Sequence, residues 1–100
     1  MQTPHISIII EYYVAAENRE LFLARLSENC AATLKDDGCL RMEIAMPDGG
    51  DGSVVFLTER WRDQAAIEKH RQQSGHDRLH ERIDTIVASK RVTEGSIVFG

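Results

Sequence analysis

The sequence has few cysteines, no long hydrophobic run and no excess of positive charge. No apolar run approaches the ~20 residues that cross a bilayer as a helix, so we expect no contact with membranes. The 16 acidic and 12 basic residues give a formal net charge of −4. This balance argues against nucleic acid as a partner, because proteins that bind nucleic acid usually carry a basic patch.

The beginning of the chain lacks the charged and apolar regions of a signal peptide, so we expect a cytoplasmic protein. The two cysteines, Cys30 and Cys39, are too few for a disulfide scaffold and do not form a CxxC pair. In a reducing cytoplasm they are expected to be free thiols.

Motifs for cofactors are also missing: there is no dinucleotide fingerprint, no P-loop and no cysteine-rich metal site. We therefore predict an activity that needs no cofactor and no resident metal. One metal arrangement stays open, because His76 and His80 lie four residues apart on one expected helix and could chelate Zn²⁺ or Ni²⁺. No third ligand has a firm spacing to them.

The length of 100 residues suits one domain, residues 1–100, with a modest core that a partner surface would help to cover. Hydrophobic periodicity predicts the order β-α-β-β-α-α-β. Asp63 and Ser74 are expected to cap the second and third helices, because their side-chain oxygens can accept the free N–H groups of a first turn. The expected strands cover residues 5–14, 39–46, 54–61 and 89–99, the first helix covers residues 16–35, and a hairpin turn covers residues 47–52.

This order predicts a ferredoxin-like α+β sandwich, in which an antiparallel sheet carries all helices on one side. The first strand is apolar on both sides near its middle, so we expect it to be central and covered on both faces. A homodimer that packs sheet against sheet would bury the helix-free face. That face would carry four side chains poorly suited to water: Tyr13, Val54, Phe56 and Phe99.

The candidate site lies in residues 54–76. Strand alternation places Glu59 and Trp61 on one face of the third strand. His70 lies on the inner side of the following helix, and His76 comes after a polar break, in the first turn of the third helix. One carboxylate, one indole and two imidazoles can therefore converge. His76 is expected to be neutral there, because a helix N-terminus disfavours imidazolium.

Each of these residues also has a purely structural explanation. Trp61 could be a core or edge aromatic, and the histidines could be hydrogen-bonded core residues. Glu59 on an apolar strand face would need a partner, which Arg60 or Arg82 could supply.

Three segments resemble the antibiotic biosynthesis monooxygenase family of dimeric α+β barrels. Residues 11–22 resemble its first strand and helix entry. Residues 36–47 resemble its acidic-acidic-Gly-x-Leu-Arg-aromatic strand, and residues 58–76 its Glu-x-Trp…His…Pro-His signature. Within the family, the chain is most similar to proteins that resemble the isomerase degrading phosphorylated autoinducer-2. The resemblance covers residues 8–99 and implies a homodimer with a pocket between sheet and helices in each subunit.

Carried over position by position, the resemblance implies a catalytic group and a substrate-binding group of residues. The candidate catalytic residues are His76, His70 and Glu59, and the candidate substrate-binding residues are Trp61, Asn29 and Arg41. 

Three positions depart from the family pattern. Gly75 stands where Pro is usual, and Met42 replaces a common aromatic residue. Cys30 stands where the autoinducer-degrading relatives can carry a His, which disfavours that isomerase activity. The first strand also lacks the Asn that heme-degrading relatives use, which disfavours heme degradation.

Three functions are compatible with these residues. The first is a cofactor-independent monooxygenase acting on a quinol or similar small aromatic molecule. His76 or His70 would deprotonate the substrate, Trp61 would stack on it, and Asn29 or Arg41 would stabilise the anion. The reaction of that anion with O₂ is implied by the resemblance. The second is an isomerase or other proton-transfer enzyme on a small carbonyl compound, phosphorylated or not. The third is a non-catalytic dimer that binds a small molecule.

Overall fold

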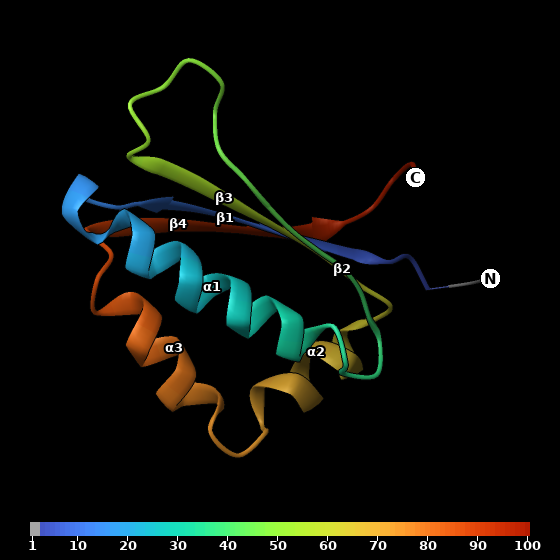
Figure 1. Ribbon diagram of the computed structural model, residues 1–100. Coiled ribbons are helices and arrows are strands. Elements are labelled where there is room, and N and C mark those ends of the chain that lie inside the picture. The colour runs from blue at the N-terminus through green and yellow to red at the C-terminus, as the bar shows by residue number, and fades with distance from the viewer. Residues whose placement is uncertain (1–2) are drawn as a thin grey trace.

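A four-stranded antiparallel sheet carries all the helices on one side, in a computed structural model that describes residues 3–100 (Figure 1). The order in the sheet is β2-β3-β1-β4. This is the predicted ferredoxin-like α+β architecture, built from two interleaved β-α-β units. In chain order the elements are β1 (Ile6–Tyr13), the 3₁₀ turn η1 (Ala16–Asn18), α1 (Arg19–Thr33), β2 (Cys39–Ala45), β3 (Val54–Trp61), α2 (Gln64–Arg71), α3 (His76–Asp84) and β4 (Ser89–Ser96).

The core lies between the sheet and the helices. Strand alternation sends Ile8, Ile10 and Tyr12 of the central strand β1 into this layer, where all three are buried. Hydrophobic periodicity along α1 gives one stripe of Phe22, Leu26, Cys30 and Thr33, and all four are buried. The largest side chains with no appreciable exposure are Trp61, Phe22, Leu26, Leu57, Ile67, Val14 and Val55.

The junction of β3 and α2 forms as predicted. Asp63 is the N-cap of α2, and its Oδ1 accepts a hydrogen bond from the backbone N of Ala66 at 2.9 Å. This bond satisfies one of the free N–H groups of the first turn. The cap starts the helix two residues after Trp61, so His70 is held over the end of the sheet.

The predicted cap of α3 is wrong. Gly75, and not Ser74, is the N-cap residue, and its φ of 88° lies in the left-handed region that glycine adopts without steric cost. The backbone N of His76 donates to the carbonyl of Gln73 at 3.2 Å, which closes a tight turn between α2 and α3. A single left-handed glycine therefore brings His76 close to His70.

The predicted ends of two other elements also differ from the structure. β4 ends at Ser96, because its neighbour β1 begins at the paired residue Ile6 and offers no strand beyond it. Val98 and Phe99 are 99% and 96% exposed, so the apolar pattern of residues 97–99 does not mark a strand. The first helix begins as η1, continues as α1 and ends at Thr33 rather than at residue 35.

The helix-free face of the sheet is open in the single chain. Ile9 and Tyr13 of β1 are 41% and 38% exposed there, and Val54 and Phe56 of β3 are half-buried. β1 is central, as predicted, but only its helix-facing side is covered within the chain. Phe99 lies beyond β4 and is almost fully exposed, so it is not part of the strand surface. None of the helices in residues 3–100 has the length and apolar character needed to cross a membrane.

The turn between α1 and β2 depends on Gly38. Its φ is 88°, and a Cβ at this position would overlap the Ala66 methyl group on α2. Gly49, in the β2–β3 loop, has a φ of 74° but no neighbour within 4 Å of an added Cβ.

We expect Gly38→Ala to lower the free energy of unfolding by about 2–5 kcal/mol, and Gly49→Ala by about 1–2 kcal/mol, because only the first adds a clash to the conformational cost. Urea denaturation of both variants measures the difference. Equal losses would show that α2 does not pack on this turn.

Candidate functional site

A cavity of about 200 Å³ lies between the sheet and all three helices. This is where the resemblance placed the pocket. Its apolar wall comes from the strands and includes Ile8, Ile10 and Leu57. Its polar groups come from β3, from Lys90 of β4 and from the helices. They include five of the six predicted site residues: Asn29, Glu59, Trp61, His70 and His76.

Arg41 is the sixth predicted residue, and the structure places it elsewhere. It pairs in the β2–β3 ladder with Arg60, which points away from the helices, and it lies 3.6 Å from Glu43 in an exposed ion pair. Arg41 is therefore on the helix-free face of the sheet, and within this chain it does not reach the cavity. Strand alternation against Met42, which faces the cavity, carried this signal in the sequence.

His70 is held by a carboxylate that sequence reasoning did not single out. Its Nδ1 lies 2.5 Å from Oδ2 of Asp36, and only 14% and 15% of the two side chains are exposed. Gln73 Nε2 donates to the other carboxylate oxygen at 2.9 Å. Nδ1 faces Asp36, which leaves Nε2 as the nitrogen free to act on a ligand. In the sequence, Asp36 stands out only as the first acidic residue of the family-like segment 36–47.

Glu59 is bonded to Trp61 and not to an arginine. Trp61 Nε1 donates to Glu59 Oε1 at 2.8 Å, and the indole is fully buried. Burial raises the pKa of the Glu59 carboxyl, while the indole bond and His70 act in the opposite direction. The predicted partners are wrong, because Arg60 Nε donates to His5 on the opposite face and no bond joins Arg82 to Glu59 within residues 3–100.

Four rings follow one another along the cavity wall. The ring centroids are 5.2 Å apart for Trp61 and His70, 4.9 Å for His70 and His76, and 4.1 Å for His76 and His80. His76 Nδ1 lies 3.1 Å from Oδ1 of the exposed Asp77. Burial and the neighbouring His76 lower the pKa of His80 to about 4. The structure thus adds a third imidazole to the two that were predicted to converge.

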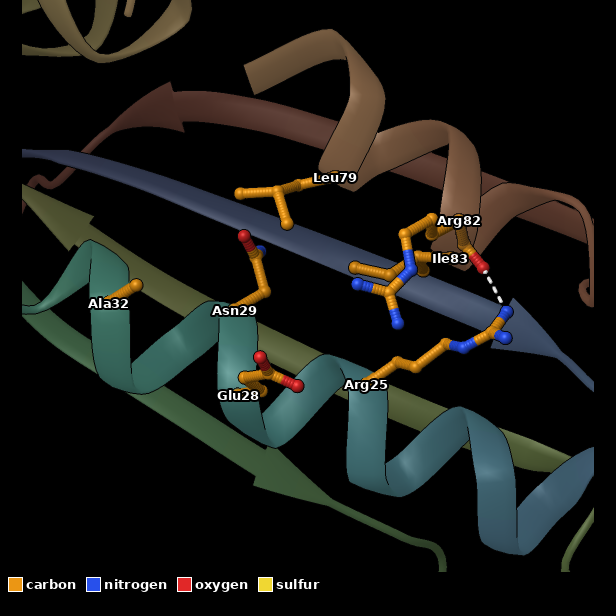
Figure 2. A pocket seen from close by; sticks show the side chains of 7 residues that line it. All are labelled: Arg25, Glu28, Asn29, Ala32, Leu79, Arg82 and Ile83. Atoms are coloured by element: carbon orange, nitrogen blue, oxygen red, sulfur yellow. Dashed lines mark hydrogen bonds between the residues drawn. The ribbon is translucent and has the colours of Figure 1, made fainter. Parts of the chain in front are cut away.

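A second cavity, of about 140 Å³, lies between α1 and α3 (Figure 2). Arg25 on α1 donates from Nη1 to the backbone carbonyl of Arg82 on α3 at 2.7 Å, and the Arg82 side chain extends toward α1. Asn29, which is 9% exposed, lines both this cavity and the first one. The two cavities are therefore neighbours, separated by the Asn29 side chain.

The sequence profile of the antibiotic biosynthesis monooxygenase family matches residues 5–82, which is most of the chain. The protein belongs to this family. No protein with a curated function matches the sequence significantly.

Solved structures of other members of this fold superimpose closely on the chain. A variant of a cofactor-independent oxygenase from Streptomyces nogalater aligns with a TM-score of 0.88 at 10% identity, over 98% of this chain and 97% of its own. A protein named as an antibiotic biosynthesis monooxygenase aligns at 0.81 and 20% identity, over 93% and 98%. A Mycobacterium tuberculosis protein aligns at 0.85 and 20% identity, over 96% and 97%. At these identities the likeness establishes the fold alone.

The lowered pKa of His80 predicts a loss of stability in acid. The unfolded chain takes up a proton near pH 6.5, but folded His80 does so only near pH 4, so the free energy of unfolding falls as the pH drops through this window. The groups that act on His80 are His76, His70, Asp84 and Lys90. We expect His80→Gln to lose less stability than the wild type between pH 7 and pH 4.5, measured by urea denaturation.

His5→Gln is the matched control, because His5 bonds to Arg60 outside the cavity. The raised pKa of Glu59 also makes stability depend on pH, but it does so in the wild type and in both variants, so it cancels in the comparison. Parallel stability curves for the wild type and His80→Gln would contradict the burial of a neutral His80.

Proposed function

We propose that the protein is a cofactor-independent monooxygenase that oxidises a small aromatic, quinol-type substrate with O₂, using His70 as the base. The observation that carries the proposal is the short contact between His70, at the wall of the cavity, and the mostly buried carboxylate of Asp36. A carboxylate bonded to Nδ1 fixes the ring and leaves Nε2 to remove a proton, which is the arrangement that general-base catalysis uses.

The geometry favours His70 over His76 as the base. Asp36 is sheltered and is itself held by Gln73, whereas Asp77, the partner of His76, is fully exposed. A solvated carboxylate orients an imidazole weakly. His76 stands edge-on to His70 at 4.9 Å, where it can pass the abstracted proton toward solvent.

The cavity suits a small, flat and largely apolar substrate. Its volume of about 200 Å³ is below the ~300 Å³ at which pockets for drug-sized ligands begin. The strand side offers mainly aliphatic and aromatic groups beside Glu59 and Lys90, while Asn29 supplies an amide that can donate to an enolate or phenolate oxygen. Glu59 opposes such an anion less than an ordinary carboxylate would, because burial raises its pKa.

The reaction needs no group besides O₂. His70 Nε2 takes a proton from the substrate, and the resulting electron-rich carbanion transfers electrons to O₂ and forms a C–O bond. The resulting peroxide anion takes up one proton, from the protonated His70 or from solvent through His76, and the hydroperoxide then eliminates water. One CH₂ group and one O₂ thereby become one carbonyl group and one water. Fully buried Trp61 contributes by holding Glu59 in the wall, and its stacking on a substrate stays a prediction.

Oxygen uptake by the purified protein tests the role of His70. With a panel of hydroquinones and anthrones and no added cofactor, we expect uptake above the spontaneous rate. His70→Gln is expected to lower kcat/KM by about 10²–10⁴-fold, the usual contribution of a positioned base. Asp36→Asn should lower it in the same direction, because the amide no longer fixes the ring. His5→Gln should match the wild type. Full activity in folded His70→Gln would exclude this residue as the base.

A second candidate is an isomerase acting on a small phosphorylated carbonyl compound. The observation in its favour is the second cavity, where Arg25 and Arg82 supply cations for a phosphate and Asn29 is shared with the cavity that holds the base. Such an enzyme would exchange substrate C–H hydrogen with deuterium from solvent without consuming O₂. Binding of a small molecule with neither O₂ uptake nor hydrogen exchange would instead favour a non-catalytic binding protein.

We also infer that the open face of the sheet is the interface of a homodimer. Ile9, Tyr13, Val54 and Phe56 form an apolar patch on this face, and pairing of two sheets would remove it from water. Sedimentation equilibrium at micromolar concentration should give twice the chain mass. Phe56→Arg should shift the protein to monomers, because two charges would meet in the interface. Leu21→Arg places the same charge on exposed α1 and should leave the dimer intact. A monomeric wild type would refute the interface.

A further inference from the structure

Three histidines meet at one point of the cavity wall. A ring nitrogen from each of His70, His76 and His80 lies within 4.8 Å of those of the other two. His70 comes from α2, and the other two lie one turn apart on α3. The sequence offered only the pair on α3. The left-handed Gly75 turn between the helices supplies the third ligand that the pair lacked.

From this geometry we propose that His70, His76 and His80 bind one divalent transition-metal ion of the Zn²⁺ class per chain. Three imidazoles are the donor set of known three-histidine zinc sites, where an exchangeable group occupies the fourth position. Here the fourth position would face the cavity, which the same three histidines line. The site goes beyond the proposed monooxygenase activity, which needs no metal.

Two of the three rings are already oriented as metal ligands usually are. A metal-bound imidazole generally donates its other N–H to a carboxylate or carbonyl. Nδ1 of His70 lies 2.5 Å from Asp36, and Nδ1 of His76 lies 3.1 Å from Asp77, which leaves Nε2 of each ring for the metal.

The ring movement that an ion requires is small. Ligand nitrogens at ~2.0–2.1 Å from a tetrahedral ion lie about 3.3 Å from one another. The present separations of up to 4.8 Å would therefore close by about 1.5 Å, which rotation about side-chain bonds achieves without moving a helix. Glu59 and Asn29 also line the cavity and could bond to a water molecule on the ion.

Metal binding and proton abstraction use the same lone pair. An ion bound to Nε2 of His70 leaves no base for the proposed reaction, so Zn²⁺ would inhibit the monooxygenase. The two proposals remain separable, because metal binding is measured without substrate.

Titration calorimetry with Zn²⁺ on the untagged, EDTA-treated full chain tests the site, and Co²⁺ absorption reports the coordination geometry. We expect one ion per chain and a visible Co²⁺ spectrum of tetrahedral intensity. His80→Gln should weaken Zn²⁺ binding at least 10-fold, although His80 is not the proposed base. Asp36→Asn should weaken it about 10–100-fold, as loss of a carboxylate behind a metal-bound histidine does.

The fourth histidine of the chain provides the control. His5→Gln should bind Zn²⁺ like the wild type, because His5 bonds to Arg60 on the other face of the sheet. Thermal melting of each metal-free variant identifies any that fail to fold, and His76→Gln then replaces a misfolded His80→Gln. Absence of saturable 1:1 binding, or binding as tight as that of the wild type in folded His80→Gln or His76→Gln, would overturn the site and leave the role of His70 as a base untouched.

Discussion

The contact between Asp36 and His70 holds the candidate site together. These residues are 34 positions apart, and their contact joins the turn after α1 to the last turn of α2. The neighbouring residues strengthen the same junction. The carbonyl of Gly38 accepts from the backbone N of Arg62 at 2.8 Å, and the Arg62 guanidinium binds Asp37. The exposed ion pair adds little stability by itself, but the backbone bond and the packing of Gly38 against α2 fix where Asp36 lies.

Because this junction sits at one end of the sheet, it decides how the cavity can be used. Trp61 and Glu59 form part of the cavity wall on β3, and the rings of the three histidines follow one another beside them. A single lone pair on His70 can then take either a proton or a metal ion. Membership of the antibiotic biosynthesis monooxygenase family favours proton abstraction, and the cluster of three imidazoles favours metal binding.

Local rules predicted the elements well and predicted their contacts less well. Alternation and periodicity were enough for the strand order along the chain, the buried stripe of α1 and the cap at Asp63. At the start of α3, Ser74 and Gly75 are both plausible ends of a turn. The turn from α2 into α3 requires a positive φ at the N-cap, so glycine and not serine takes that position. β4 ends where its antiparallel neighbour β1 begins, which the sequence of β4 alone cannot show.

The same limit applies to the site. Glu59, Trp61, His70 and His76 could be brought together from the sequence, because one strand and its following helices are contiguous in the chain. Asp36 could not be assigned, since its role depends on a contact between distant segments. Arg41 was assigned by resemblance against its own alternation pattern, and the backbone geometry of the strand placed it on the other face.

The protonation of the His70 ring tests the account most directly, and it requires no substrate. Long-range ¹H–¹⁵N correlation spectra of the metal-free, histidine-labelled protein at pH 8, where an ordinary imidazole is neutral, distinguish the two ring nitrogens. If Asp36 holds His70 ready to accept a proton, Nδ1 carries the hydrogen and Nε2 is bare, and this preference weakens in Asp36→Asn. A hydrogen on Nε2, or on both nitrogens, would contradict the proposed base and leave the cavity as a binding site only.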